Sequence, residues 1–171
     1  MEQKPISHVT AGLIIGAVLV LLSILSSYAE SAGRASQWLV YLVIFGGLIF
    51  FITRYGKSRN NNVTFGNLFA YGFKTTAVFI LLMIGFIVLF NLIFPEFKEK
   101  GFEMARAEME KNKSLKEEDI DRAMGWARDY FWVFAIGGTA LLYTILGAIG
   151  SLIGAAVTKK QPRNPVDQLD L

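Results

Sequence analysis

The stretch Thr75–Pro95 reads TTAVFILLMIGFIVLFNLIFP and contains no Asp, Glu, Lys or Arg in 21 residues. An α-helix rises about 1.5 Å per residue, so this stretch is long enough to cross the roughly 30 Å hydrocarbon core of a bilayer. A surface helix of a soluble domain needs a charged or polar face toward water, and this stretch has none. The sequence therefore predicts a transmembrane helix here.

Three further stretches lack charge in the same way: 5–29, 35–53 and 130–158. All 17 basic and 14 acidic residues of the 171-residue chain fall outside the four stretches. This partition excludes a soluble globular enzyme and a disordered chain, and the absence of Cys excludes a disulfide-stapled secreted domain. Only helices or closed barrels satisfy the backbone in lipid, and the stretches lack the period-2 alternation of barrel strands. We predict an all-α polytopic protein, a single membrane domain over 1–171 with spans at about 9–28, 36–53, 74–94 and 130–157.

The lengths of the connections predict the topology. Five residues, Glu30–Arg34, join the first two spans and force an antiparallel hairpin. The fourth span is expected to return beside the third, which gives two hairpins in one bundle, followed by a flexible tail at 159–171.

The first span could instead be a signal peptide, because Ser27-Tyr28-Ala29 resembles a small-residue cleavage site. Its apolar run is longer than the about 7–15 residues usual in a signal peptide, so we expect it to remain as a span.

The connection 96–129 holds ten acidic and eight basic residues and reads as two helices. Pro95 suits a first helical position, and Ser114-Leu-Lys-Glu117 matches a capping box that would begin the second helix. We predict an extramembrane helical hairpin. It could be a compact cap over the bundle or a docking surface for a protein partner.

Charge placement favours one orientation. No acidic residue lies between Glu30 and Glu96, so the connection between the second and third spans is purely basic. Total Lys and Arg counts are nearly equal on the two sides, but all three Trp fall at the face of the long connection, as in an interfacial belt. We expect both termini in the cytoplasm. Membrane lipids are the expected partners of the basic residues at that face, Arg54, Lys57, Arg59, Lys159 and Lys160.

Small residues recur at helical spacing in the first and fourth spans, at Gly12 and Gly16 and at Gly147, Gly150 and Gly154. Small residues allow helices to approach closely in lipid. We predict that they pack the first span against the fourth inside the bundle. A dimer seam is the other interpretation, and a homo-oligomer has no further support in the sequence.

The segment before the third span carries aromatics at Phe65, Phe69 and Phe73, with glycines at Gly66 and Gly72. This spacing predicts an amphipathic interfacial helix leading into the span. Lys74 follows directly and is either an interfacial anchor or, as the sharper alternative, a substrate-binding residue.

The chain offers no recognisable catalytic constellation. His8 is the only His, and there is no Cys to complete a metal cluster. No Gly-x-Ser-x-Gly turn or phosphate-binding glycine loop occurs. The sequence therefore predicts no enzymatic activity, no catalytic residue, no cofactor or metal, and no nucleic-acid partner.

Three stretches taken together resemble the domain of unknown function 4199 family, small four-helix integral membrane proteins of bacteria. They are Thr-Phe-Gly-x-x-Phe-x-x-Gly-Phe-Lys at 64–74, Phe94-Pro-Glu-Phe97 with the helical connection after it, and the glycine-rich end Leu152-Ile-Gly-Ala-Ala-Val-Thr-Lys-Lys160. The resemblance implies a bacterial inner-membrane protein and brings no site residues.

The leading hypothesis is a non-enzymatic structural, accessory or interaction subunit. The alternative is a small-solute transporter or channel component, which could act alone or as an oligomer. A polar cavity lined by Tyr71, Lys74 and Asn91 would favour transport, whereas a tightly packed core would favour the accessory role.

Overall fold

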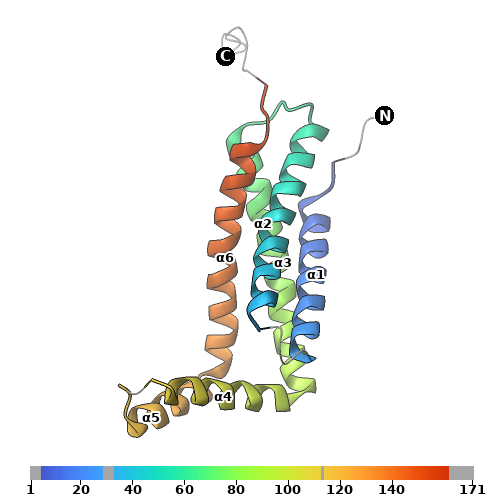
Figure 1. The fold of residues 1–171 in the computed structure, drawn as a ribbon. Coiled ribbons are helices and arrows are strands. Elements are labelled where there is room, and N and C mark those ends of the chain that lie inside the picture. Colours follow the sequence, from blue (N-terminus) through green and yellow to red (C-terminus); the bar gives the residue numbers. More distant parts are fainter. Residues whose placement is uncertain (1–4, 29–32, 113, 162–171) are drawn as a thin grey trace.

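The computed structural model describes residues 5–28, 33–112 and 114–161, and these form six helices without strands. Four of the helices are long and apolar enough to cross a membrane, which confirms the all-α polytopic fold. In Figure 1 these four stand side by side, while the other two lie across one end. The helices are α1 (His8–Tyr28), α2 (Gly33–Ser58), α3 (Phe65–Ile93), α4 (Pro95–Glu110), α5 (Glu117–Asp129) and α6 (Phe131–Val157).

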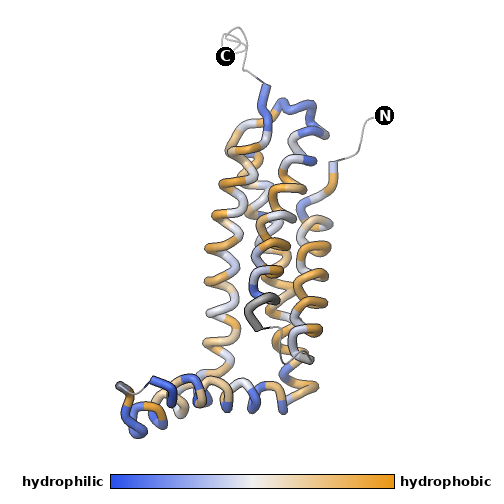
Figure 2. Tube along the Cα trace, viewed as in Figure 1, coloured by the Kyte–Doolittle hydropathy of each residue, from blue (hydrophilic) through white to orange (hydrophobic). Residues whose placement is uncertain are grey.

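The bundle has two distinct ends. We call the end that holds the start of α1, the α2–α3 connection and the end of α6 the terminal end, and the end that holds α4 and α5 the hairpin end (Figure 1). Figure 2 shows hydrophilic residues gathered at these two ends and hydrophobic residues along the four spans. This is the distribution expected when the middle of the bundle lies in hydrocarbon.

Two helix boundaries differ from the predicted spans. α2 continues to Ser58, and α3 begins at Phe65, where the Thr64 hydroxyl caps the helix by accepting from the Asn67 N–H at 3.2 Å. The segment 65–73 is continuous with the third span, so the helix that was expected to lead into the span does so without a break. The start predicted at residue 74 lies too late, because Lys74 ends the charge-free stretch of sequence but does not interrupt the helix.

The predicted hairpins are present, with α1 packed beside α2 and α6 beside α3. The prediction that the first and fourth spans pair is wrong. α1 and α6 both pack along α3, α6 also packs on α2, and the described residues of α1 and α6 share no extensive contact. The four helices thus form a ring in which α1 and α6 are the diagonal pair.

The glycines nevertheless lie at helix contacts, as their spacing indicated. A Cβ at Gly12 would lie 2.7 Å from the Thr75 carbonyl oxygen, so α1 meets α3 there. Gly147 faces the Thr76 side chain of α3, whereas Gly150 and Gly154 face α2. The spacing of small residues therefore identified the contact faces but not their partner helices.

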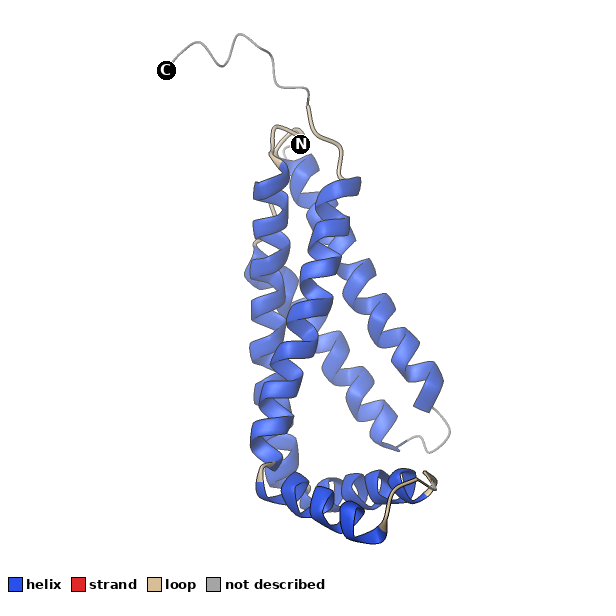
Figure 3. Cartoon of the chain, turned by 90° about the vertical axis from the view of Figure 1, so that its left-hand side faces the viewer, coloured by secondary structure: helices blue, strands red, loops and turns tan. Residues whose placement is uncertain are grey.

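The packed core occupies the half of the bundle nearer the terminal end. Its buried side chains come from all four spans. Between this core and the hairpin end, no described residue of the spans is buried. Figure 3 shows the reason: the α1–α2 pair diverges from the α3–α6 pair toward the hairpin end. The largest fully buried apolar side chains are Leu19, Ile44, Leu48, Ile52, Leu68 and Phe79.

Candidate functional site

The connection between α3 and α6 folds into the predicted helical hairpin. Phe102 of α4 is buried against Ile120 and Met124 of α5, and its ring lies 5.7 Å from that of Phe131 at the start of α6. This small apolar cluster is separate from the core of the bundle. The hairpin is consequently a unit with its own interior.

Ion pairs on the outside of the hairpin join its two helices. Arg106 Nη2 lies 2.8 Å from Asp121 Oδ1, and Arg128 Nη1 donates to Glu99 Oε2 at 2.8 Å. The Glu110 carboxylate, which accepts from Arg106, and the Asp121 carboxylate raise the pKa of the Arg106 guanidinium. These groups are largely exposed, so solvent screens each pair and leaves it little net contribution to stability.

The predicted capping box is not formed. α5 begins at Glu117 with Lys116 at the cap position and without a side-chain cap. The Ser114 hydroxyl instead donates to Asn112 Oδ1 at 2.6 Å, within the turn. A local side-chain bond within the turn has replaced the cap, as Ser and Asn side chains commonly do.

The hairpin does not sit centrally over the bundle. It contacts the spans at α3 and α6 and extends past α6 in Figure 1. At the α5–α6 corner, a concave surface of about 450 Å³ is lined by one ion pair and four mainly apolar side chains: Asp119 with Arg122, and Ala123, Trp126, Ala127 and Phe134. Just beyond the corner, a Cβ at Gly137 or Gly138 would meet nothing within 4 Å.

The terminal end has the opposite electrostatic character. Its described residues include six Lys or Arg and no Asp or Glu, and the described ion pairs all lie in the hairpin. Among the described parts of the chain these cations therefore have no carboxylate partner. They are Arg54, Lys57, Arg59, Lys74, Lys159 and Lys160.

The end of α6 is tied to the α2–α3 connection at the terminal end. Gln161 N donates to the Asn61 carbonyl at 3.0 Å, and Lys160 Nζ lies 5.7 Å above the Phe65 ring. Asn60 and Asn61 form the turn with positive φ values of 53° and 59°. From position 162 onward, the predicted flexible tail lies outside the described residues.

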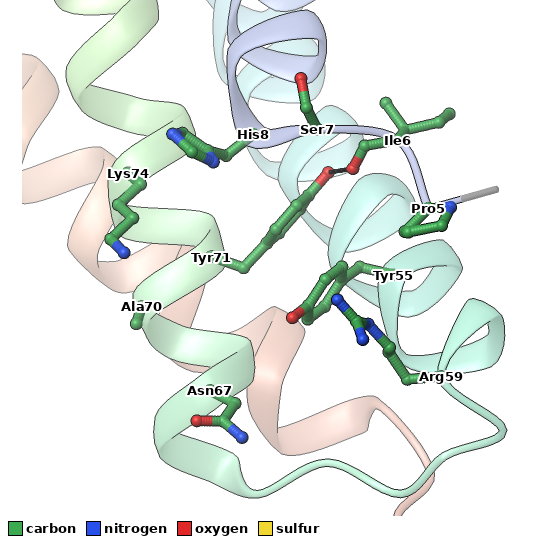
Figure 4. Close-up of a pocket in the computed structure, with 10 residues that line it drawn as sticks. All are labelled: Pro5, Ile6, Ser7, His8, Tyr55, Arg59, Asn67, Ala70, Tyr71 and Lys74. Atoms are coloured by element: carbon green, nitrogen blue, oxygen red, sulfur yellow. Dashed lines mark hydrogen bonds between the residues drawn. The ribbon is translucent and has the colours of Figure 1, made fainter.

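A cavity of about 400 Å³ opens at the terminal end between α2, α3 and the residues before α1 (Figure 4). The helix spacing explains its walls, because residues 55 and 59 share one face of α2 and residues 67, 71 and 74 share one face of α3. Its lining residues are Pro5, Ile6, Ser7, His8, Tyr55, Arg59, Asn67, Ala70, Tyr71 and Lys74.

Tyr71 holds the walls of this cavity together. Its hydroxyl donates to the Ile6 carbonyl at 3.0 Å, and its ring stacks on Tyr55 with centroids 4.3 Å apart. Arg59 in turn lies over the Tyr55 ring at 5.8 Å. In the view of Figure 4, His8 and Lys74 lie on one side of Tyr71, and Tyr55 and Arg59 lie on the other.

The structure brings together only part of the expected polar set. Tyr71 and Lys74 line the cavity, but Asn91 lies toward the hairpin end of α3, where its amide donates to the Ile87 carbonyl at 2.9 Å. Sequence reasoning missed Tyr55, Asn67 and the segment 5–8, because no local pattern indicates that these distant segments meet. Among the described residues, no group of three His, Asp or Glu is placed to hold a metal ion.

Residues 10–160 match the family model described as "Protein of unknown function (DUF4199)". The chain belongs to the DUF4199 family. The match covers most of α1 and all of α2 to α6, including the cavity walls on α2 and α3 but not residues 5–8. The comparison with curated proteins and that with solved structures gave no match. The family description assigns no activity, and the membrane fold rests on the four helices that are long and apolar enough to cross a bilayer.

Proposed function

We propose that this DUF4199 protein is a non-enzymatic accessory subunit of the bacterial inner membrane, and that it binds a transmembrane helix of a partner protein at the α5–α6 corner. The observation that carries the proposal is the hairpin itself, which extends past α6 and so forms a concave corner with the lipid-facing side of that helix. A hairpin acting only as a cap would pack on the ends of α1 and α2, whereas the described residues of α4 and α5 share no extensive contact with those helices.

The corner has the surface that a helix partner needs. Phe134, Gly137 and Gly138 lie within about one turn of each other on α6, and the two glycines have open space beyond them. Small residues let another helix approach closely, which is how helices associate in lipid. Trp126, which is 64% exposed, adds an amphipathic ring suited to the membrane boundary.

The packing of the terminal half supports the accessory role over transport. Mainly apolar side chains and close glycine contacts fill this half of the bundle, where a solute pathway would need polar lining. Its buried Thr75, Thr76 and Thr158 hydroxyls donate to carbonyls one turn earlier in the chain. The polar groups expected to line such a pathway are divided between the two ends of α3, with Lys74 at one and Asn91 at the other.

The partner surface is tested with photo-crosslinking side chains placed singly at Ala123 and at Gly138 in native membranes. We expect both positions to capture the same protein, with the crosslinked peptide near the end of one of its transmembrane segments. The same side chain at Gly85 of α3, which also faces open space, is the control and should capture lipid alone.

Replacing residues 99–127 by a short linker should abolish capture at position 138. Capture that persists unchanged in this deletion variant would show that the hairpin is not part of the docking surface.

We also infer that both termini lie in the cytoplasm, supported by the six cations that lie close to the ends of the spans at the terminal end. The chain lacks Cys, so single cysteines report sidedness cleanly. An impermeant thiol reagent added outside spheroplasts should label Asn112→Cys fully and Asn61→Cys only after lysis. Labelling in the reverse order would invert the orientation.

A further inference from the structure

We propose that the cavity at the terminal end binds the phosphate-bearing headgroup of an anionic phospholipid. Five of the six cations of this end, all except Lys74, were expected to attract lipid headgroups, whereas the cavity joins Lys74 and Arg59 in one bounded site. This inference is independent of the proposed partner at the α5–α6 corner, which lies at the other end of the bundle.

The cavity carries two cations that no described carboxylate neutralises. Arg59 from α2 and Lys74 from α3 line the same cavity, and the described residues of the terminal end include no Asp or Glu. Guanidinium and ammonium groups form charge-assisted hydrogen bonds to phosphate oxygens, which are stronger than those between neutral groups. The electrostatics of the cavity therefore select an anion.

Neutral donors stand beside the two cations. The Asn67 amide carries two N–H donors, and the His8 ring also carries an N–H donor. The amino end of α1 also lies at the cavity, since its first residue is His8, and its dipole adds to the positive potential. A phosphate offers several acceptor oxygens and can use donors from more than one wall.

The site is held in shape without a ligand. The Tyr71 hydroxyl fixes the Ile6 carbonyl, and the stacked Tyr55 and Tyr71 rings join α2 to α3. Tyr71 is only 6% exposed, so it belongs to the packed core as well as to the cavity wall. Such preorganisation lowers the cost of ordering the side chains on binding.

The position of the cavity favours a lipid over a soluble phosphate compound. Phe73, next to Lys74 in the chain, is 40% exposed, and Phe65 at the start of the same helix is 43% exposed. Exposed apolar rings so close to the cations of this end place the cavity beside the level at which hydrocarbon gives way to headgroups. Phospholipid phosphates lie at this level. In the orientation we infer, the cavity lies at the cytoplasmic leaflet, which is the anionic one.

The test uses the full-length protein in nanodiscs of phosphatidylcholine and measures retention of added phosphatidylglycerol by native mass spectrometry. The cavity variant is Arg59→Gln/Lys74→Gln. The control variant, Arg54→Gln/Lys57→Gln, removes the same charge from the same end of the bundle, outside the cavity. All four side chains are exposed or half-buried, so both variants should fold, which thermal melting checks.

We expect the cavity variant to bind phosphatidylglycerol at least about tenfold more weakly, and the control variant to change by less than about threefold. Tyr71→Phe, which loses the bond to Ile6, should weaken retention while leaving both cations in place. Equal losses in the cavity and control variants would mean diffuse attraction and would overturn the site.

A second measurement separates the two sources of phosphate. We expect inorganic phosphate and glycerol 3-phosphate to leave lipid retention unchanged. If either displaces the lipid at equal concentration, and the cavity variant abolishes this effect, then the site takes a soluble phosphate compound and the lipid assignment is wrong.

Discussion

Replacing Gly147 with Ile is expected to force α6 away from α3 and to lower the free energy of unfolding by about 1–3 kcal/mol. A Cβ at this position would overlap the Thr76 side chain, which is fully buried and donates to the Gly72 carbonyl at 3.1 Å. Thr76 therefore cannot swing aside without losing that bond or entering another packed surface.

The surroundings leave little room for relaxation. One α3 turn before Thr76, a Cβ at Gly72 would lie 2.6 Å from both Ile52 Cδ1 and Ser151 Oγ, so α3 is pressed against α2 and α6 at the same level. Helices in lipid gain little from burying apolar surface and depend on close contact instead. A side chain inserted here disrupts packing along the whole α3–α6 interface.

Gly138→Ile on the same helix is the matched control, because a Cβ at Gly138 meets nothing within 4 Å. Unfolding in a denaturing detergent, followed by circular dichroism, should show the large loss of stability for Gly147→Ile alone.

The contact itself is tested by a double variant that moves side-chain volume from α3 to α6. Gly147→Ala combined with Thr76→Gly should recover part of the stability that Gly147→Ala loses. If Gly138→Ile were as harmful as Gly147→Ile, the loss would reflect a β-branched residue in the helix and not the packing against α3.

This glycine illustrates what the sequence could and could not predict. Partition of charge predicted the four spans, because lipid excludes charge at depth regardless of which helices are neighbours. Spacing predicted that Gly147, Gly150 and Gly154 form a contact face. It could not name the partner helix, since any helix can pack on a small-residue face, and the true partners proved to be α3 and α2.

The cavity was beyond sequence reasoning for a related physical reason. Its walls come from the segment 5–8, from Tyr55 and Arg59, and from Tyr71 and Lys74, which meet only after the α2–α3 turn and the α1–α3 contact have formed. Only the i,i+4 spacing of Tyr55 and Arg59 and the i,i+3 spacing of Tyr71 and Lys74 were visible, and each describes one face of one helix. The capping box failed because α5 begins at Glu117, which leaves Ser114 two residues before the cap position, where its hydroxyl donates to Asn112 Oδ1.

Replacing Phe102 with Ala should open the α4–α5 hairpin while leaving the four spans folded. Truncation of a buried Phe costs about 3–5 kcal/mol, and here it removes the largest member of a cluster whose other buried residues are Ile120 and Met124. The Phe102 ring also lies 4.7 Å from the Arg128 guanidinium carbon, and the substitution eliminates this cation–π interaction as well.

The effect should exceed that of any ion pair on the hairpin surface. Arg106 is 41% exposed and bridges Glu110 and Asp121, so solvent screens both ion pairs and Arg106→Ala should destabilise the hairpin much less than Phe102→Ala does. Hydrogen exchange in detergent or nanodiscs separates the two cases. We expect Phe102→Ala to speed amide exchange across α5 by about 100-fold, with exchange in α3 and α6 unchanged near Gly72 and Ser151.

Met104→Ala on the same helix is the control for the loss of an apolar side chain, because Met104 is 65% exposed and should change exchange little. Equal acceleration by Phe102→Ala and Arg106→Ala would mean that surface ion pairs hold the hairpin together. Acceleration that spread into α3 would mean that hairpin and bundle unfold as one unit, and the α5–α6 corner would then not be an independently stable surface. Because the hairpin has its own interior, its partner-binding surface can change without destabilising the membrane core. Amide exchange that accelerates in the hairpin alone would show this independence.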